Sequence, residues 1–239
     1  MSNRLTDQRV LVIGGSSGIG EATARQAAQA GAQVTIASRS LERLADALRR
    51  LPPGVTSAAL DASDADEVAT FFRAGAPWDH VVVSASSTRT GPARSLPMSD
   101  AQAAMQSKFW SAYHVGRSAR IAAGGSLTFV SGVYSVRPSP TAVLQGAINA
   151  ALEALARGLA LELAPAVRVN AVSPSTTETP LWDRLGGAGK ADKFAAMNAR
   201  LPAGRIAQPG DIAAAILFLA ANSFATGSTL LIDGGDALA

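Results

Sequence analysis

The chain has 239 residues, 48% of them hydrophobic, enough to bury one large core, so we expect a single domain spanning residues 1–239. It contains no cysteine, which excludes disulfides and thiolate metal sites, and its two histidines, His80 and His114, form no zinc site without carboxylate ligands; each is interpreted as structural. The net charge of +3 comes from scattered arginines, and there is neither a secretory signal nor a membrane-length apolar stretch, which favours a cytoplasmic protein that binds neither nucleic acid nor membranes.

Short apolar runs alternate with longer helical patterns along the whole chain. The predicted strands are 10–13, 34–37, 55–60, 81–84, 126–131, 167–172 and 230–232. The predicted helices are 18–30, 41–50, 65–74, 99–122, 142–164 and 210–221, with Ser40, Ser63 and Ser99 as candidate N-caps. This alternation predicts an α/β fold of the doubly wound Rossmann type, with three layers and a mostly parallel seven-stranded sheet.

Two later segments, residues 142–164 and 173–209, differ in composition from the rest of the chain. Residues 142–164 are apolar almost all round, apart from a polar line of Asn149, Glu153 and Arg157, which indicates a core helix that also meets a partner subunit. Residues 173–209 are rich in Pro, Gly, Ser and Thr, with a helical pattern only at 190–200. We expect this stretch to form a loop or lid over a ligand site.

A glycine-rich turn joins the first predicted strand to the first helix. Gly14, Gly18 and Gly20 are spaced as in turns that approach a pyrophosphate closely, and the helix N-terminus beyond them favours anions. The alternative is an ordinary strand-to-helix turn. The strand-turn-helix context favours a dinucleotide site, and the whole turn belongs to it: Gly14, Ser16, Ser17, Gly18, Ile19 and Gly20.

The end of the second strand bears on the choice of cofactor. An NAD site usually has a carboxylate there that accepts hydrogen bonds from the adenosine ribose, whereas this chain has Ser38 followed by Arg39. A guanidinium group can bind a 2′-phosphate through two parallel hydrogen bonds, so NADP(H) is favoured over NAD(H). Alternatively, Arg39 is a solvated residue at the start of a helix.

From the glycine turn to its C-terminus, the chain resembles the short-chain dehydrogenase/reductase family. The turn matches the family's TGxxxGxG motif with Ile13 in place of Thr. Residues 168–174, RVNAVSP, resemble the family's RVNAVxPG, with Ser175 in place of the last Gly. Residues 204–206, 226–228 and 233–235 resemble the C-terminal signature. The resemblance implies further cofactor contacts, at Asp61 and Ala62 after the third strand, at Ser84 and Ala85 after the fourth, and at Pro174, Thr177 and Thr179 after the sixth.

The resemblance also implies hydride transfer between NADP(H) and a carbonyl or alcohol, with Asn, Ser, Tyr and Lys as catalytic residues. The last two form a YxxxK motif, in which the lysine lowers the tyrosine pKa from one helical turn away. Here the four positions hold Ser107, Gly132, Gln145 and Asn149. An amide has no proton to exchange near neutral pH and no charge with which to lower a neighbouring pKa.

Other residues are candidates for the missing chemistry. Tyr134 is the best substitute acid, although a pocket-wall aromatic is the favoured interpretation. Ser131 is placed to orient a carbonyl, and Gln145 and Asn149 remain candidates at the altered catalytic positions, with Asn149 also a candidate for hydrogen bonds to the ribose. Lys108, next to Ser107, is interpreted as a solvated helix charge.

Two functions follow from this pattern. The first is an NADP(H)-dependent oxidoreductase with a non-standard proton relay. The second is a catalytically weak or inactive NADP(H)-binding sensor or partner protein. Leu181, Trp182, Phe194 and Met197 in the 173–209 segment suggest an apolar small-molecule carbonyl or alcohol as substrate. The resemblance implies a homodimer or homotetramer.

Overall fold

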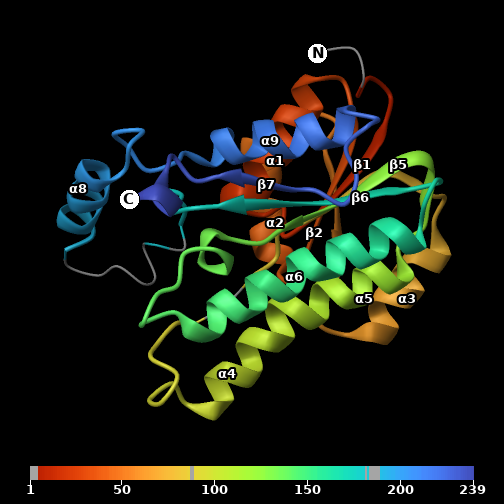
Figure 1. Ribbon diagram of the computed structural model, residues 1–239. Coiled ribbons are helices and arrows are strands. Elements are labelled where there is room, and N and C mark those ends of the chain that lie inside the picture. The colour runs from red at the N-terminus through yellow and green to blue at the C-terminus, as the bar shows by residue number, and fades with distance from the viewer. Residues whose placement is uncertain (1–4, 87–88, 181, 183–188) are drawn as a thin grey trace.

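The computed structural model describes residues 5–86, 89–180, 182 and 189–239 (Figure 1). One parallel seven-stranded sheet runs through it, in the order β3-β2-β1-β4-β5-β6-β7. The strands are β1 (Arg9–Ile13), β2 (Gln33–Ser38), β3 (Thr56–Ala59), β4 (Trp78–Val83), β5 (Ile121–Val130), β6 (Arg168–Pro174) and β7 (Thr229–Ile232). All seven predicted strands are present, and the predicted doubly wound Rossmann fold is confirmed.

Helices cover both faces of the sheet (Figure 1). On one face α3 (Ala65–Ala74), α5 (Ser111–Ser118) and α6 (Val143–Glu162) form a buried cluster with the strands. On the other, α1 (Gly18–Gln29), α2 (Leu41–Arg50) and α9 (Pro209–Ala221) do the same. The central strands β1 and β4 end in apolar runs, residues 10–13 and 81–83, whose members are all buried, as expected for strands covered on both faces.

Several predicted boundaries are wrong. The helix predicted at 99–122 is divided into α4 (Met98–Ala104), a π-helical turn η1 (Met105–Trp110) and α5, and β5 begins at Ile121. The N-cap of α3 is Asp64, and not Ser63 as predicted. The N-cap of α4 is Pro97, and not Ser99 as predicted. Ser40 caps α2 as predicted, accepting a hydrogen bond from the backbone N–H of Arg43.

The segment after β6 contains α8 (Lys190–Arg200), where the helical pattern predicted it. Leu181, a predicted pocket residue, lies outside the described residues. Trp182 and Phe194 form an edge-to-face pair with ring centroids 5.4 Å apart, which anchors α8 to the preceding segment. Among the helices of the described ranges, none has both the length and the apolarity to cross a lipid bilayer.

The strand order changes direction between β1 and β4. The chain proceeds outward from β1 to β2 and β3, then returns to place β4 on the opposite side of β1. The helices that follow these two strands leave toward opposite faces of the sheet, and a crevice opens at the carboxyl ends between them. The first strand ends at Ile13, so the glycine turn lies in this crevice.

Candidate cofactor and active site

A cavity of about 620 Å³ lies over the carboxyl ends of the strands. Thirteen predicted cofactor residues line it: Gly14, Ser16, Ser17, Gly18, Ile19, Ser38, Arg39, Asp61, Ala62, Ser84, Ala85, Pro174 and Thr179. Gly20, Thr177 and Asn149 are not among the lining residues. The predicted contacts, from five different strand ends, thus gather around one cavity.

Glycine is required in the turn because backbone atoms come too close for a side chain. A Cβ atom on Gly20 would lie 2.2 Å from the carbonyl oxygen of Gly14, and one on Gly14 would lie 2.5 Å from the amide nitrogen of Ala85. Gly14 and Gly18 also have positive φ angles, of 85° and 55°. The turn therefore stays tight and leaves its backbone open to the cavity.

The first turn of α1 faces the cavity with its backbone donors available. Ser17 is the N-cap residue, and within the described structure its side chain makes no capping hydrogen bond. The methyl carbon of Thr179 would lie only 3.1 Å from a Cβ on Gly18, so Thr179 packs against the turn. The backbone donors and the dipole of the helix N-terminus favour an anion such as a pyrophosphate beside this turn.

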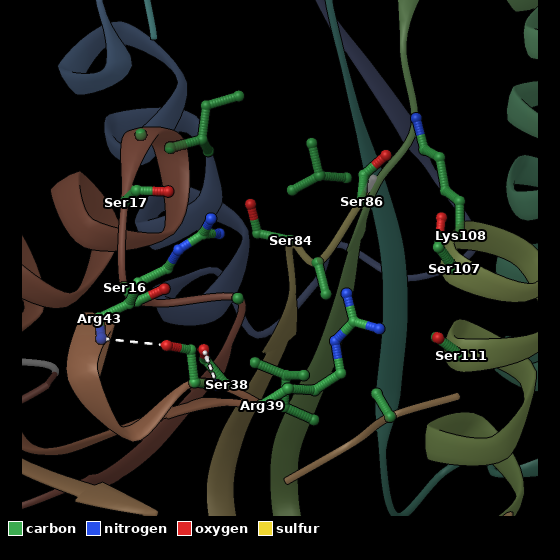
Figure 2. Close-up of a pocket in the computed structure, with 18 of the residues that line it drawn as sticks. Ser16, Ser17, Ser38, Arg39, Arg43, Ser84, Ser86, Ser107, Lys108 and Ser111 are labelled. Atoms are coloured by element: carbon green, nitrogen blue, oxygen red, sulfur yellow. Dashed lines mark hydrogen bonds between the residues drawn. The ribbon is translucent and has the colours of Figure 1, made fainter. Parts of the chain in front are cut away.

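One end of the cavity carries two arginines and is called the cationic end, although Glu42 and Asp61 also line it. Arg39 and Arg43 line it, and both side chains extend from the region around Ser38 into the cavity (Figure 2). The Arg39 guanidinium also lies 3.9 Å from a carboxylate oxygen of Asp61, whose other oxygen accepts hydrogen bonds from Ser63. Two exposed arginines beside serine hydroxyls form a donor set suited to a phosphate monoester.

The RVNAVSP motif forms β6 and is tied to the end of α9. The Arg168 guanidinium donates hydrogen bonds to the carbonyl oxygens of Leu219 and Ala220 at the end of α9, each at 2.7 Å. Thr177 is buried and donates to the carbonyl oxygen of Ser175 at 3.0 Å. These residues fix the start of the segment that places Pro174 and Thr179 at the cavity. Thr177 does not line the cavity itself and supports this segment from the protein interior.

The opposite end of the cavity contains Lys108, and the prediction of a solvated helix charge is wrong. Its side chain is only 7% exposed. Its Nζ donates hydrogen bonds to the carbonyl oxygen of Ser131 and to Oδ1 of Asn149, each at 2.7 Å. Figure 2 shows Lys108 beside Ser107, on the far side of the cavity from Arg43. The π-helical turn η1 carries this lysine inward, a kind of irregularity common at functional sites.

The lysine belongs to a buried polar network on α6. Burial lowers the pKa of Lys108 to about 8, and the nearby charge of Glu153 opposes that shift. Glu153 Oε1 accepts hydrogen bonds from the hydroxyls of Ser131, at 2.9 Å, and Ser135, at 2.6 Å. Asn149 and Glu153, two members of the polar line predicted on this helix, thus face inward.

The altered catalytic positions fit one another. The amide nitrogen of Asn149 would lie 2.8 Å from a Cβ on Gly132, so a serine at that position would collide with the amide. Gln145, one turn earlier on α6, lines the cavity. Tyr134 is half-buried and is not one of the lining residues. Ser131 lines the cavity, yet its hydroxyl proton is engaged by Glu153.

The predicted site residues did not include Arg43, Ser40, Lys108 or Glu153. Arg43 follows Arg39 by four residues, and this spacing at the start of a helix was an available signal. Lys108 had no such signal, because the π-helical turn changes which residue faces inward. Within the described ranges, no group of three His, Asp or Glu side chains suited to a metal ion comes together.

Comparison with known proteins agrees with this geometry. The family model described as enoyl-(acyl carrier protein) reductase matches residues 14–236. The chain is 35% identical to the short-chain dehydrogenase/reductase ATR9 of Stachybotrys chlorohalonatus, over 95% of this chain and 96% of ATR9.

Two similar solved structures contain the reduced cofactor. One is a small-chain dehydrogenase in complex with NADPH, 31% identical, with a TM-score of 0.81 over 98% of this chain and 100% of the other. The second is the NADPH-bound short chain oxidoreductase from Pseudomonas aeruginosa PAO1, described as containing an atypical catalytic center. It is 31% identical, with a TM-score of 0.88 over 97% of this chain and 98% of that one. The chain belongs to the short-chain dehydrogenase/reductase family of oxidoreductases.

Proposed function

We propose that this protein is an NADP(H)-dependent oxidoreductase that interconverts a small apolar carbonyl compound and its alcohol with a non-standard proton relay. The observation that carries the cofactor assignment is the pair of guanidinium groups, Arg39 and Arg43, at one end of the cavity. They lie where β2 ends, the place at which dinucleotide sites recognise the adenosine ribose. The NADPH in two related structures supports the same assignment.

The chain's own residues divide the work along the cavity. The backbone of the turn from Gly14 to Gly18 and the start of α1 bind the pyrophosphate, and Arg39 and Arg43 bind the 2′-phosphate. Ser84, Ala85, Pro174 and Thr179 line the space between this end and Lys108. NADP(H), when bound, supplies or accepts the hydride, while the protein holds the carbonyl in place and excludes water.

The proposed cofactor preference is tested by titrating the protein with NADPH and with NADH and following the fluorescence of each. NADPH is expected to bind at least about tenfold more tightly, since a charged hydrogen bond to the 2′-phosphate contributes more than about 1.4 kcal/mol. Loss of NADPH absorbance is then followed with benzaldehyde, hexanal and cyclohexanone as probe carbonyls. Equal affinity for the two cofactors would contradict the preference.

A second candidate function is a catalytically weak or inactive NADP(H)-binding sensor or partner protein. Gln145 favours it, because this amide lines the cavity where the family has its catalytic tyrosine. The two functions differ in turnover. A sensor binds NADPH and reduces none of the three probes, whereas the oxidoreductase consumes NADPH with at least one of them.

We also propose a single-domain cytoplasmic protein that assembles as a homodimer or homotetramer and binds neither membranes nor nucleic acid. Exposed apolar residues on the outer faces of η1, α5 and α6 support the assembly: Trp110, Tyr113, Val143 and Leu161. Such residues cost free energy in water and are covered in subunit interfaces. Analytical ultracentrifugation gives the assembly state directly, and a monomer at micromolar concentration would contradict it.

A further inference from the structure

The ionisable residues that line the cavity are unevenly distributed. Among the described lining residues, Arg39, Glu42, Arg43 and Asp61 gather at the cationic end. At the opposite end, Lys108 lies among neutral lining residues: Ser107, Ser111, Ser131 and Gln145. Among the described lining residues at that end, Lys108 is therefore the one side chain that ionises.

The hydrogen bonds of Lys108 leave one of its three N–H donors available to the cavity. An ammonium group has three N–H donors, and two of them are directed to the Ser131 carbonyl oxygen and to Asn149 Oδ1. These two acceptors fix the position of Nζ, and the third N–H remains available to a ligand in the cavity that Lys108 lines. The Ser131 hydroxyl, in contrast, donates to Glu153.

We propose that Lys108 is the proton donor of this site and that its ammonium group protonates the carbonyl oxygen of the substrate. This inference rests on the proposed oxidoreductase function and names the acid that its relay uses. A lysine from η1, hydrogen-bonded to an asparagine on α6, takes over the task of the missing phenol. Asn149 is a positioning residue, because it contacts the lysine and does not line the cavity.

The proposed step balances. The carbonyl carbon gains a C–H bond and two electrons from the hydride of NADPH, which is oxidised to NADP⁺. The π pair of the C=O bond moves onto oxygen, which forms an O–H bond with a proton from Lys108 Nζ. Lys108 becomes a neutral amine and recovers its proton from water. In the oxidation direction the neutral amine accepts the same proton.

The surroundings of Lys108 suit this exchange near neutral pH. Burial lowers its pKa to about 8, which brings an amine within the range of a useful acid. Glu153, from α6, is the charged group that acts on it, and the groups it contacts from β5 and α6 are uncharged. A solvated lysine would hold its proton too tightly to release it in each cycle.

The test combines variants with a direct view of the lysine. The chain has only three lysines, Lys108, Lys190 and Lys193, so ¹³C-lysine NMR gives few signals. The signal missing from Lys108→Met is expected to titrate near pH 8 in the native protein. Reduction of benzaldehyde, hexanal or cyclohexanone at saturating NADPH is expected to slow above the same pH, as the acid form is lost.

Two substitutions separate the electrostatic effect of the Lys108 charge from its role as a proton donor. Lys108→Met and Lys108→Arg are both expected to lower kcat by about 100-fold or more, since general acids contribute that much. NADPH affinity, followed by fluorescence, is expected to change little. Arginine keeps the charge but holds its proton too tightly to act as an acid. If Lys108→Met does not fold, Lys108→Arg and the native pH profile still decide the matter.

The outcomes distinguish the two proposals. If the native protein binds NADPH but reduces none of the probes, the oxidoreductase function fails and the role of Lys108 fails with it. If the native protein reduces a probe and Lys108→Arg keeps its rate, only the role of Lys108 is overturned. A rate that stays constant from about pH 6 to about pH 10, or a Tyr134→Phe variant that loses as much rate as Lys108→Met, overturns it too.

Discussion

The Ser131 hydroxyl donates a hydrogen bond to Oε1 of Glu153 at 2.9 Å, on the buried side of the cavity wall. Ser135 donates to the same oxygen, and the carboxylate therefore sits in a site of two neutral donors close to the Lys108 ammonium. A buried carboxylate needs such donors, and a buried ammonium needs such a counter-charge. The opposite charges of Glu153 and Lys108 therefore set the net charge at the Lys108 end of the cavity.

The first prediction concerns Glu153→Gln. The carboxylate favours the protonated form of Lys108 and holds its pKa higher than burial alone would. Removing that charge lowers the pKa further, so the pH above which the reduction rate falls is expected to move down. The rate is measured against pH at saturating NADPH with a probe carbonyl. Glu162→Gln, on the exposed end of the same helix, is the control and is expected to leave the profile in place. An upward shift in Glu153→Gln would contradict this charge balance.

The second prediction concerns the two arginines at the cationic end. Arg39→Ala and Arg43→Ala are each expected to weaken NADPH binding by about tenfold or more while NADH binding changes little, because only NADPH carries the 2′-phosphate. Fluorescence titration with both cofactors measures the difference.

Arg49→Ala is the matched control for these variants. Arg49 lies on α2 like Arg43, but it pairs with Asp46 and does not line the cavity. It removes the same charge from the same helix. A loss of NADPH affinity in Arg49→Ala equal to that in Arg43→Ala would show a general charge effect in place of a phosphate contact.

The fold was predictable because parallel strands that are buried on both faces appear in the sequence as short continuous apolar runs. The runs ending at Ile13 and Val83 are apolar without interruption, and both lie in strands and are buried. The beginning of β5 was not predictable in this way. Residues 122–125 are alanine or glycine, and the pairing of β4 with β5 shifts register between Trp78 and His80, so no apolar run marks the boundary.

The cofactor half of the site was more predictable than the catalytic half. Glycine spacing and Arg39 are local features, and a local pattern places them at the cavity. The contact of Lys108 with Asn149 joins residues 41 positions apart. It depends on a π-helical turn, which changes the helical period within a few residues, so a pattern based on 3.6 residues per turn does not reveal that this lysine is buried.

The third prediction concerns Gly20→Ala. The added methyl would lie 2.2 Å from the carbonyl oxygen of Gly14, so the turn must open. We expect a loss of about 1–3 kcal/mol in the free energy of unfolding, as for other overpacked sites, together with weaker NADPH binding. Chemical denaturation and fluorescence titration measure the two effects.

Gly158→Ala is the control for that substitution. Gly158 lies inside α6, and a Cβ there would meet no atom within 4 Å. Alanine favours the helix over glycine by about 0.8–1 kcal/mol, so this variant is expected to gain stability and keep its NADPH affinity. A loss of stability in Gly158→Ala, or an unchanged affinity in Gly20→Ala, would contradict the proposed reason for the glycines.

The last prediction is a pH dependence of stability that arises at His80. Burial lowers the pKa of His80 from 6.5 to about 4, and its Nδ1 lies 2.9 Å from the Ser126 hydroxyl oxygen. Between these values the unfolded chain binds a proton that the folded protein excludes, so stability is complete above about pH 6.5 and falls as the pH drops toward about 4. The full loss is about 3 kcal/mol, at about 1.4 kcal/mol for each pH unit. Urea denaturation at several pH values compares the native protein with His80→Asn, which cannot titrate, and with His114→Gln as control. The native protein and His114→Gln should lose more stability on acidification than His80→Asn does, and three parallel curves would contradict the assignment to His80.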